Sequence, residues 1–244
     1  MSETSGLRIG HYIDRTYGKV PLKLVGRASA GAMASFLIEE GDNISSMVAV
    51  EDWDAFVVVG LGFSLVRLVE KWTSFQPDCL SEPVGEHLLV PELVDGYDNA
   101  GMDTTKALAL IRKLRTLTDK PISLVPGPLP AAWVLNRSGG RFDSFQPFAG
   151  YRNRAFLLAQ FEKQVNRVRA MGVDVVNPPE ETVIDDMWTR TEFCLGQPSD
   201  PSPDSFYAKG DFYHMNREYG DLVSRSIMQE KVLQGIGNSL GTKE

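Results

Sequence analysis

The predicted strand Phe56–Gly60 constrains the fold of this chain most, because its first four residues are all apolar. Aromatic and β-branched residues favour strands, and a strand without polar positions is expected where both faces of a parallel strand are covered. Three further β-rich runs, Leu22–Gly26, Ile122–Val125 and Val173–Val176, alternate with longer helical stretches. This alternation predicts an α/β fold in which helices cover a central parallel sheet.

Two stretches between the strands carry apolar residues at helical spacing. The stripes are Leu108, Ile111, Leu114 and Leu117 in the first stretch, and Leu157, Phe161, Val165 and Val168 in the second. Both stripes are expected to face the core. The segment Asn216–Leu233 predicts a closing helix with Tyr219, Leu222, Val223 and Ile227 on its apolar side, and residues 235–244 predict a flexible tail.

Two segments, Asn136–Tyr151 and Gly196–Gly210, are rich in Gly, Pro and aromatic residues and predict irregular structure. Loops of this length are uncommon inside a compact domain and often serve as lids or binding loops. The alternative is that each segment is only a solvated excursion of the chain.

Composition excludes several classes of protein. A net charge of −7 argues against nucleic acid as the partner, since nucleic-acid binders concentrate Lys and Arg on one face. No apolar run approaches the roughly 20 residues that span a bilayer, and no signal peptide is evident, so we expect a cytoplasmic protein without membrane partners. Cys79 and Cys194 lack paired spacing and predict two buried thiols. With 244 residues, 43% of them hydrophobic, the chain predicts a single domain over 1–244.

Ligands of open parallel sheets bind beyond the carboxyl ends of the strands, where this chain has small-residue turns. Gly31 and Gly62 lie in two of them, and glycine permits the positive φ and close backbone approach that an oxyanion site needs. The alternative is that these glycines only make the turns. A dinucleotide site is not predicted, because Leu65 stands where a third glycine is required after Gly60 and Gly62.

The sharpest local feature is Asp211, three residues before His214. A carboxylate at this spacing can reach Nδ1 of the imidazole, fix its tautomer and leave Nε2 to take a proton from a hydroxyl nucleophile. The alternative is that Asp211 caps a turn and His214 is an ordinary surface residue. His11 and His87 have no comparable partner in the sequence and are expected to be structural or exposed.

The segment Asp211-Phe212-Tyr213-His214, followed by Asn216 and Tyr219-Gly220, resembles the last conserved block of the SGNH (GDSL-like) hydrolases, and in particular uncharacterised bacterial members. The turns Gly26–Gly31 and Gly60–Gly62 resemble the second and third blocks. The resemblance implies a three-layer, flavodoxin-like sandwich and a Ser-His-Asp triad that hydrolyses esters without a metal or an organic cofactor.

Within this resemblance, Ser2 takes the place of the nucleophile, with Asp211 and His214 completing the triad and Gly31 and Gly62 as oxyanion-hole candidates. Two departures stand out. The family's first strand and the glycine before its serine are expected to be missing, and Gly62 falls where the third block usually has an asparagine. Ser29 and Ser64 are the alternative nucleophiles.

The resemblance implies a small-molecule ester or an O-acylated sugar as the substrate. A rival hypothesis follows from the two departures: an SGNH-like fold that has lost catalysis and acts as a ligand-binding or assembly module. A missing first strand would leave backbone groups unpaired at a sheet edge, which favours association, including that of copies of this chain.

Overall fold

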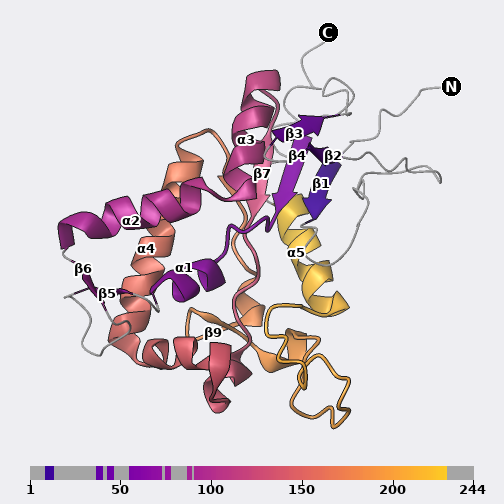
Figure 1. Ribbon diagram of the computed structural model, residues 1–244. Coiled ribbons are helices and arrows are strands. Elements are labelled where there is room, and N and C mark those ends of the chain that lie inside the picture. The colour runs from indigo at the N-terminus through magenta and orange to yellow at the C-terminus, as the bar shows by residue number, and fades with distance from the viewer. Residues whose placement is uncertain are drawn as a thin grey trace, which may run out of the picture.

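The computed structural model describes residues 9–13, 37–40, 43–46, 55–72, 75–77, 87–89 and 91–229 (Figure 1). The predicted strand Leu22–Gly26 and the predicted tail at 235–244 lie outside these residues. Within them the chain has an α/β fold, with helices packed on both faces of a parallel sheet.

The main sheet has four parallel strands in the order β1-β4-β7-β8. They are β1 (Ile9–Ile13), β4 (Ala55–Val59), β7 (Ile122–Val125) and β8 (Asp174–Val175). Strand β4 is paired with β1 along one edge and with β7 along the other. The predicted covered strand is therefore confirmed as a central strand, which ends at Val59 so that Gly60 begins the following turn.

The sequence pattern did not predict strand β1. Its residues Ile9–Ile13 include a glycine and a histidine, and they give a weak strand signal. They pair with all five residues of β4, because the edge of β4 presents a row of backbone groups that need partners. The edge of β4 is thus covered by β1.

The remaining described elements surround this sheet. Three small pairs are β2 (Leu37–Glu40) with β3 (Asn43–Ser46), β5 (Phe75–Pro77) with β6 (His87–Leu89), and β9 (Val183–Ile184) with β10 (Trp188–Thr189). The α-helices are α1 (Leu65–Trp72), α2 (Pro91–Asp103), α3 (Lys106–Leu117), α4 (Tyr151–Arg169) and α5 (Arg217–Gln229). Short 3-10 helices are η3 (Ala132–Asn136), η4 (Gly140–Ala149), η5 (Glu180–Thr182) and η6 (Thr191–Phe193).

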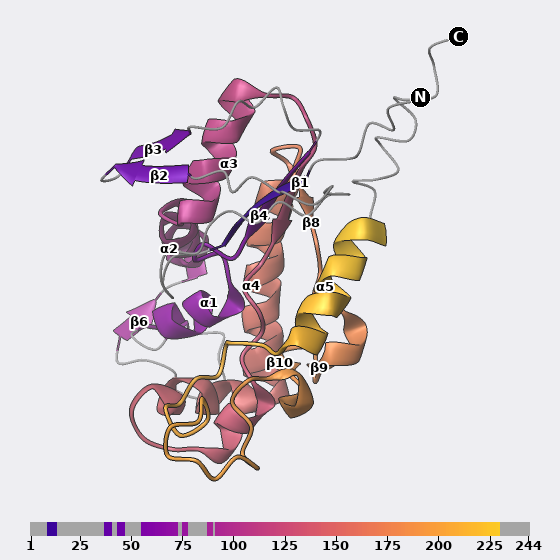
Figure 2. The ribbon, with the colours of Figure 1, turned by 90° about the vertical axis from the view of Figure 1, so that its right-hand side faces the viewer.

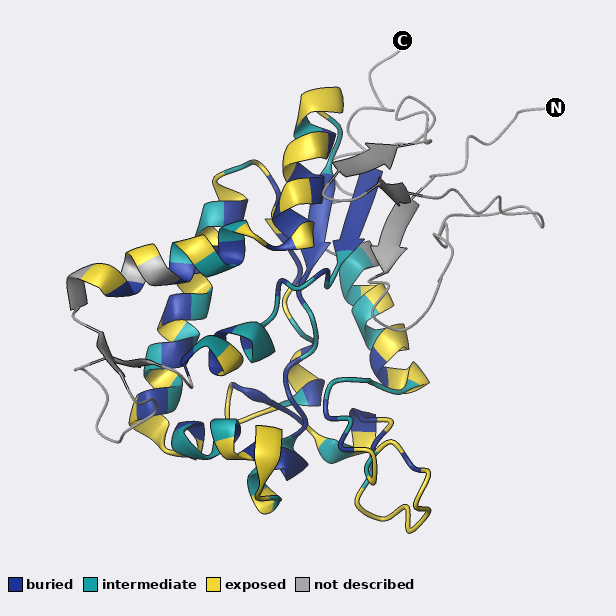
Figure 3. Ribbon diagram, viewed as in Figure 1, coloured by how far each residue is buried: buried dark blue, intermediate teal, exposed yellow. Residues whose placement is uncertain are grey.

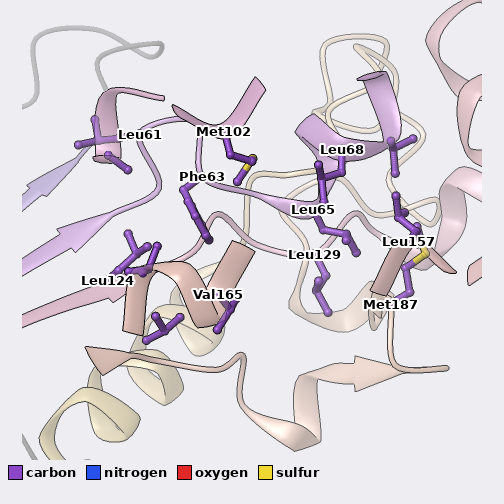
Figure 4. Close-up of a cluster of buried hydrophobic side chains, with 14 of the residues drawn as sticks. Leu61, Phe63, Leu65, Leu68, Met102, Leu124, Leu129, Leu157, Val165 and Met187 are labelled. Atoms are coloured by element: carbon purple, nitrogen blue, oxygen red, sulfur yellow. The ribbon is translucent and has the colours of Figure 1, made fainter. Parts of the chain in front are cut away.

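The two faces of the sheet are covered unequally. Phe56 and Val58 of β4 belong to a large apolar cluster built with α1, α3 and α4. Figure 4 shows part of this cluster, including Leu65 of α1 and Val165 of α4. Val57, which points to the other face, belongs to a small cluster against which Val223 and Ile227 of α5 pack. Helix α5 therefore lies on the opposite side of the strands from α3, as Figure 2 shows.

Both predicted helical stripes lie on helices that cover the sheet. The buried members are Leu108, Ile111 and Leu114 on α3, and Leu157, Val165 and Val168 on α4. Leu117 differs from the prediction: it is 45% exposed, because it is the last residue of α3, at an end that is largely exposed (Figure 3). None of the described helices has the length and apolar character needed to cross a membrane.

The two segments predicted to be irregular differ from one another. Most of Asn136–Tyr151 is helical, and Phe142, Phe145 and Phe148 of η4 are buried in the core. The aromatic residues that suggested a binding loop are thus packing residues. Gly196–Gly210 contains turns and bends without a helix or strand, as predicted, and it leads directly into Asp211.

Candidate active site

Asp211 and His214 are in direct contact just before α5. Oδ2 of Asp211 is hydrogen-bonded to Nδ1 of His214. The side chains are 15% and 25% exposed, so the pair is shielded but still reached by solvent. An ionised carboxylate only accepts hydrogen bonds, so this contact favours the tautomer with its proton on Nδ1 and leaves Nε2 as the basic nitrogen.

The second carboxylate oxygen of Asp211 shapes the turn between the two residues. Oδ1 accepts hydrogen bonds from the N–H groups of His214, at 3.0 Å, and Tyr213, at 3.3 Å. This is the local bonding by which Asp fixes turns. The sequence left open whether Asp211 caps a turn or pairs with His214. In the structure it does both: Oδ1 caps the turn and Oδ2 contacts His214.

Phe212, between the two residues, anchors them to the core. Its side chain is 2% exposed, and its ring packs edge-on against Phe145 with 4.9 Å between the centroids. Burying a phenylalanine contributes about 1.5–3 kcal/mol, which helps to fix the backbone on either side of it. The buried position of Phe212 leaves Asp211 and Tyr213 partly exposed beside it.

A short segment joins this pair to the carboxyl edge of the sheet. The N–H of Gly127, two residues after β7, donates to the C=O of Phe63 in the turn after β4, at 2.8 Å. Four residues later, the N–H of Ala131 donates to the C=O of Phe212, also at 2.8 Å. Four residues of extended chain span at most about 14 Å. Phe212, and with it the Asp211–His214 pair, is therefore tethered to the carboxyl side of the sheet, the side on which open parallel sheets bind ligands.

Gly196 allows the segment before Asp211 to fold back on itself. A Cβ at this position would lie 2.6 Å from the carbonyl oxygen of Asp211 and 3.0 Å from the nitrogen of Tyr207. These are backbone atoms, and they are held in place because the N–H of Asp211 donates to the C=O of Phe206 at 2.8 Å. A residue larger than glycine would have to displace Asp211.

Two exposed apolar side chains flank the imidazole of His214. The N–H of Leu195 donates to the C=O of His214 at 2.9 Å, and the bridge between Cys194 and Met215 places Leu195 and His214 opposite each other on one face. The ring of Phe206 lies edge-on to the imidazole at 6.2 Å. Leu195 and Phe206 are 43% and 45% exposed, so apolar surface adjoins the acid–base pair.

The turn after β4 has an unusual backbone. Gly60, Leu61 and Gly62 all have positive φ, at 68°, 51° and 79°. A leucine in this conformation costs about 1–2 kcal/mol, which the burial of its side chain offsets. The turn is held from two sides, since the N–H of Gly60 donates to Val125 and the C=O of Leu61 accepts from Ala107. No described residue accepts a hydrogen bond from the N–H of Gly62.

The other predicted site residues divide into two groups. Ser2, Ser29 and Gly31 lie outside the described residues, so the nucleophile and one oxyanion candidate stay predictions. Ser64 is described, and its hydroxyl accepts a hydrogen bond from the N–H of Arg67 at 3.3 Å. This is the bonding of a residue that caps the start of a helix, here α1.

Asn216 also has a capping role. Its Oδ1 accepts from the N–H of Tyr219 at 3.0 Å, at the start of α5, and its Nδ2 donates to the C=O of Glu192 at 2.7 Å. The asparagine that carries part of the family resemblance therefore fixes where α5 begins relative to His214.

Cys194 does not supply a nucleophile. The thiol is buried, and burial, together with the carboxylates of Glu192 and Asp211, raises its pKa to about 12. It is therefore protonated at neutral pH, and a protonated thiol is a poor nucleophile. Among the described residues, no three His, Cys, Asp or Glu side chains are grouped as metal ligands.

No role in this site was predicted for Gly196, Phe212, Leu195 or Phe206 individually, although Gly196–Gly210 was predicted to be a possible binding loop. Only Gly196 and Phe212 carry a signal in the sequence, a glycine opening a loop and an aromatic residue inside the D-x-x-H segment. Leu195 gains its position from pairing with His214, 19 residues away, and Phe206 from a bond to Asp211 within an irregular loop; neither arrangement has a sequence pattern.

Comparison of the chain with models of protein families, with curated proteins and with solved structures finds no match. The features that point to a function are therefore the geometry of the site and the resemblance of its motifs.

Proposed function

We propose that the protein is a serine-dependent ester hydrolase of the SGNH type, in which His214 is the general base and Asp211 orients it. The observation that supports this most is the hydrogen bond between Oδ2 of Asp211 and Nδ1 of His214, in a segment tethered to the carboxyl side of a parallel sheet. A partly shielded carboxylate and imidazole in this arrangement are two members of a Ser-His-Asp triad.

In the proposed reaction, the serine hydroxyl attacks the acyl carbonyl while Nε2 of His214 takes its proton. The tetrahedral intermediate collapses to an acyl-enzyme, and the same proton passes to the departing alcohol. Water, activated by Nε2, then attacks the acyl-enzyme, and the serine recovers its proton as the acid is released. Asp211 orients His214 and stabilises the imidazolium that forms twice in the cycle.

The serine assigned by the resemblance is Ser2, with Ser29 as the alternative. In the family the nucleophile follows the first strand of the sheet, whereas Ser2 precedes β1 in this chain. Ser29 follows β1 and is followed by Gly31, the second oxyanion candidate. Peptide mapping of a covalent serine probe distinguishes the two.

The turn after β4 is suited to hold the oxyanion. The N–H of Gly62 has no described acceptor, and the turn is fixed by bonds to Val125 and Ala107. A backbone N–H held in this way stabilises negative charge without having to reorganise. In this proposal Gly62 acts through its backbone in place of the asparagine side chain usual in the family, with Gly31 as a second donor.

The apolar surface beside His214 supports a substrate with an apolar acyl group. Leu195 and Phe206 flank the imidazole, where the acyl group of a bound ester would lie. Each methylene fully removed from water contributes about 0.8 kcal/mol. Both a small acyl ester and an O-acylated sugar carry such a group, so both substrate classes fit this surface.

Hydrolysis of p-nitrophenyl acetate and butyrate by the wild type and by His214→Ala tests the proposal. We expect the wild type to hydrolyse both esters, and His214→Ala to lose activity by more than about 10⁴-fold with an unchanged circular dichroism spectrum. Retained hydrolysis in His214→Ala would remove His214 as the base.

The rival proposal, a non-catalytic ligand-binding or assembly module, is favoured by one observation: Gly62 replaces the asparagine that supplies a side-chain oxyanion donor in the family. Losing one such donor typically costs about 10²–10³ in rate. A folded wild-type protein that hydrolyses neither ester, yet binds the butyrate analogue butyranilide, would support this module over the enzyme.

A further inference from the structure

We propose that Arg141 is a positioning residue for the Asp211–His214 pair, and that Arg137 fastens the loop that leads to it. The inference rests on the proposed hydrolase function for its catalytic consequence. Its structural part, that Arg141 sets the geometry of the pair, can be tested without any substrate.

Arg141, on η4, contacts the residues on both sides of Asp211. Its Nη2 donates to the C=O of Gly210 and, at 3.3 Å, to the C=O of Lys209. Its guanidinium also lies 5.0 Å from the ring centroid of Phe212, within the range of a cation–π contact. One side chain therefore fixes the backbone before Asp211 and the side chain after it.

Gly210 makes this approach possible. Its φ is +73°, a conformation that strains other residues, and a Cβ there would lie 2.9 Å from Cζ of Phe142 and 3.1 Å from Nη2 of Arg141. Both demands point to glycine, one from the backbone and one from the close approach of the η4 side chains. Glycine at position 210 thus allows the side chain of Arg141 to reach the backbone next to Asp211.

Arg137, four residues before Arg141, holds the same loop at Tyr207. Its Nη1 donates to the C=O of Tyr207 at 2.7 Å. The guanidinium lies 4.5 Å from the ring centroid of Phe142 and 4.9 Å from that of Tyr207. Two arginines from a five-residue stretch thereby tie residues 207–212, which contain no helix or strand, to the buried aromatic side of η4.

The expected consequence follows from the precision that proton transfer requires. Catalytic groups must be held within about 0.5 Å of the productive geometry by the residues that support them. A misplacement of about 1 Å can lower a rate by about 10²-fold. Because Arg141 contacts neither Asp211 nor His214 in any described hydrogen bond, its loss should lower kcat through the position of the pair and leave KM unchanged.

The experiment compares Arg141→Ala and Arg141→Lys with Arg154→Ala in the full-length protein. Arg154 is a matched control: it also donates to a backbone carbonyl, that of Ala149 at 3.0 Å, and lies over an aromatic ring, that of Tyr151 at 6.0 Å. Proton NMR follows the Nδ1–H resonance of His214, which the bond to Asp211 protects from exchange. Ester hydrolysis gives kcat and KM, and thermal unfolding monitors folding.

For Arg141→Ala we expect the Nδ1–H resonance to be lost and kcat to fall by about 10- to 100-fold at constant KM. Arg141→Lys, which keeps the charge and a hydrogen-bond donor, should retain part of the Nδ1–H resonance and part of kcat. Arg154→Ala should match the wild type in resonance and kcat.

An Arg141→Ala protein that keeps the resonance and kcat of the wild type would overturn the inference. If Arg141→Ala does not fold, Arg141→Lys decides, and its equality with the wild type in both readouts would equally overturn it. If no variant hydrolyses esters, but the resonance is lost in Arg141→Ala alone, the proposed function fails and the positioning role stands.

Discussion

Two carboxylates of this protein, Asp103 and Asp211, each collect several hydrogen bonds, but from different partners. Asp103, at the end of α2, accepts from Nη2 of Arg112 at 2.6 Å and from Nη2 of Arg167 at 3.1 Å. Asp211 accepts from two backbone N–H groups and is hydrogen-bonded to His214. The first side chain is 37% exposed and the second 15%.

The difference separates a structural carboxylate from one suited to chemistry. A guanidinium stays protonated at every physiological pH, so the partners of Asp103 cannot exchange a proton with a substrate. They join α2 to α3 and α4 instead. An imidazole has one nitrogen that can donate a proton and one that can accept a proton, so the partner of Asp211 can act as an acid and a base.

The largest expected effect is in a paired substitution, Asp211→Asn against Asp103→Asn. Asp211→Asn should lower kcat for p-nitrophenyl butyrate by about 10⁴-fold, because an amide favours the wrong tautomer of the imidazole. Asp103→Asn should leave kcat within about twofold of the wild-type value, since Asp103 is not part of the pair. Equal losses in both variants would break the distinction between the carboxylates.

A second pair of variants tests the loop that holds Asp211. Gly196→Ala should lower kcat by about 10²-fold, because the added Cβ displaces the carbonyl of Asp211. The control is Gly220→Ala at an exposed position of α5, where a Cβ meets nothing within 4 Å. Alanine in a helix interior is expected to raise stability there by about 0.4–1 kcal/mol. Unchanged kcat in Gly196→Ala would show that the position of Asp211 tolerates this displacement.

The apolar surface beside His214 gives a smaller effect. In the wild type, kcat/KM should rise from the acetate to the butyrate ester by up to about 15-fold, the value for two fully buried methylenes. Phe206→Ala should reduce this rise to a fewfold difference, whereas Leu117→Ala, at an exposed leucine on α3, should not. If kcat/KM still rises by the same factor from acetate to butyrate in Phe206→Ala, the acyl group does not bind against Phe206.

The smallest effect is the pH dependence of the Asp103 network. Burial alone would raise the pKa of Asp103, but the hydrogen bonds from Arg112 and Arg167 outweigh it and lower the pKa below its ordinary 3.8. A lowered pKa stabilises the fold above that value, and the contribution is lost as the pH falls through the folded-state pKa.

For so exposed a carboxylate we expect a contribution below about 1 kcal/mol. The free energies of unfolding of the wild type and Asp103→Asn, measured by chemical denaturation, should therefore differ slightly at pH 7, and the difference should narrow as the pH falls below 3.8. A difference in the free energy of unfolding that grows as the pH falls would contradict the lowered pKa of Asp103.

The same contrast shows what the sequence could predict. Strands β4 and β7 follow from short, largely apolar runs, and helices α3 and α4 from apolar periodicity, because each element buries surface that its own residues define. Strand β1 does not, because it is a strand through its pairing with β4.

Within the site, Asp211 and His214 are three residues apart, so their contact is local and could be predicted. Arg141 and Gly210 are 69 residues apart, and the contact depends on how η4 packs. Residues that position a site through long-range contacts therefore could not be predicted from the sequence.

Labelling with a fluorophosphonate probe, followed by peptide mapping, tests the central claim most directly. We predict that the wild type and Asp103→Asn are labelled on one serine, Ser2 by the resemblance or Ser29 by its place after β1, and that His214→Ala is not labelled. Wild-type protein that is folded and remains unlabelled, or labelling that persists in His214→Ala, would contradict a serine activated by the Asp211–His214 pair.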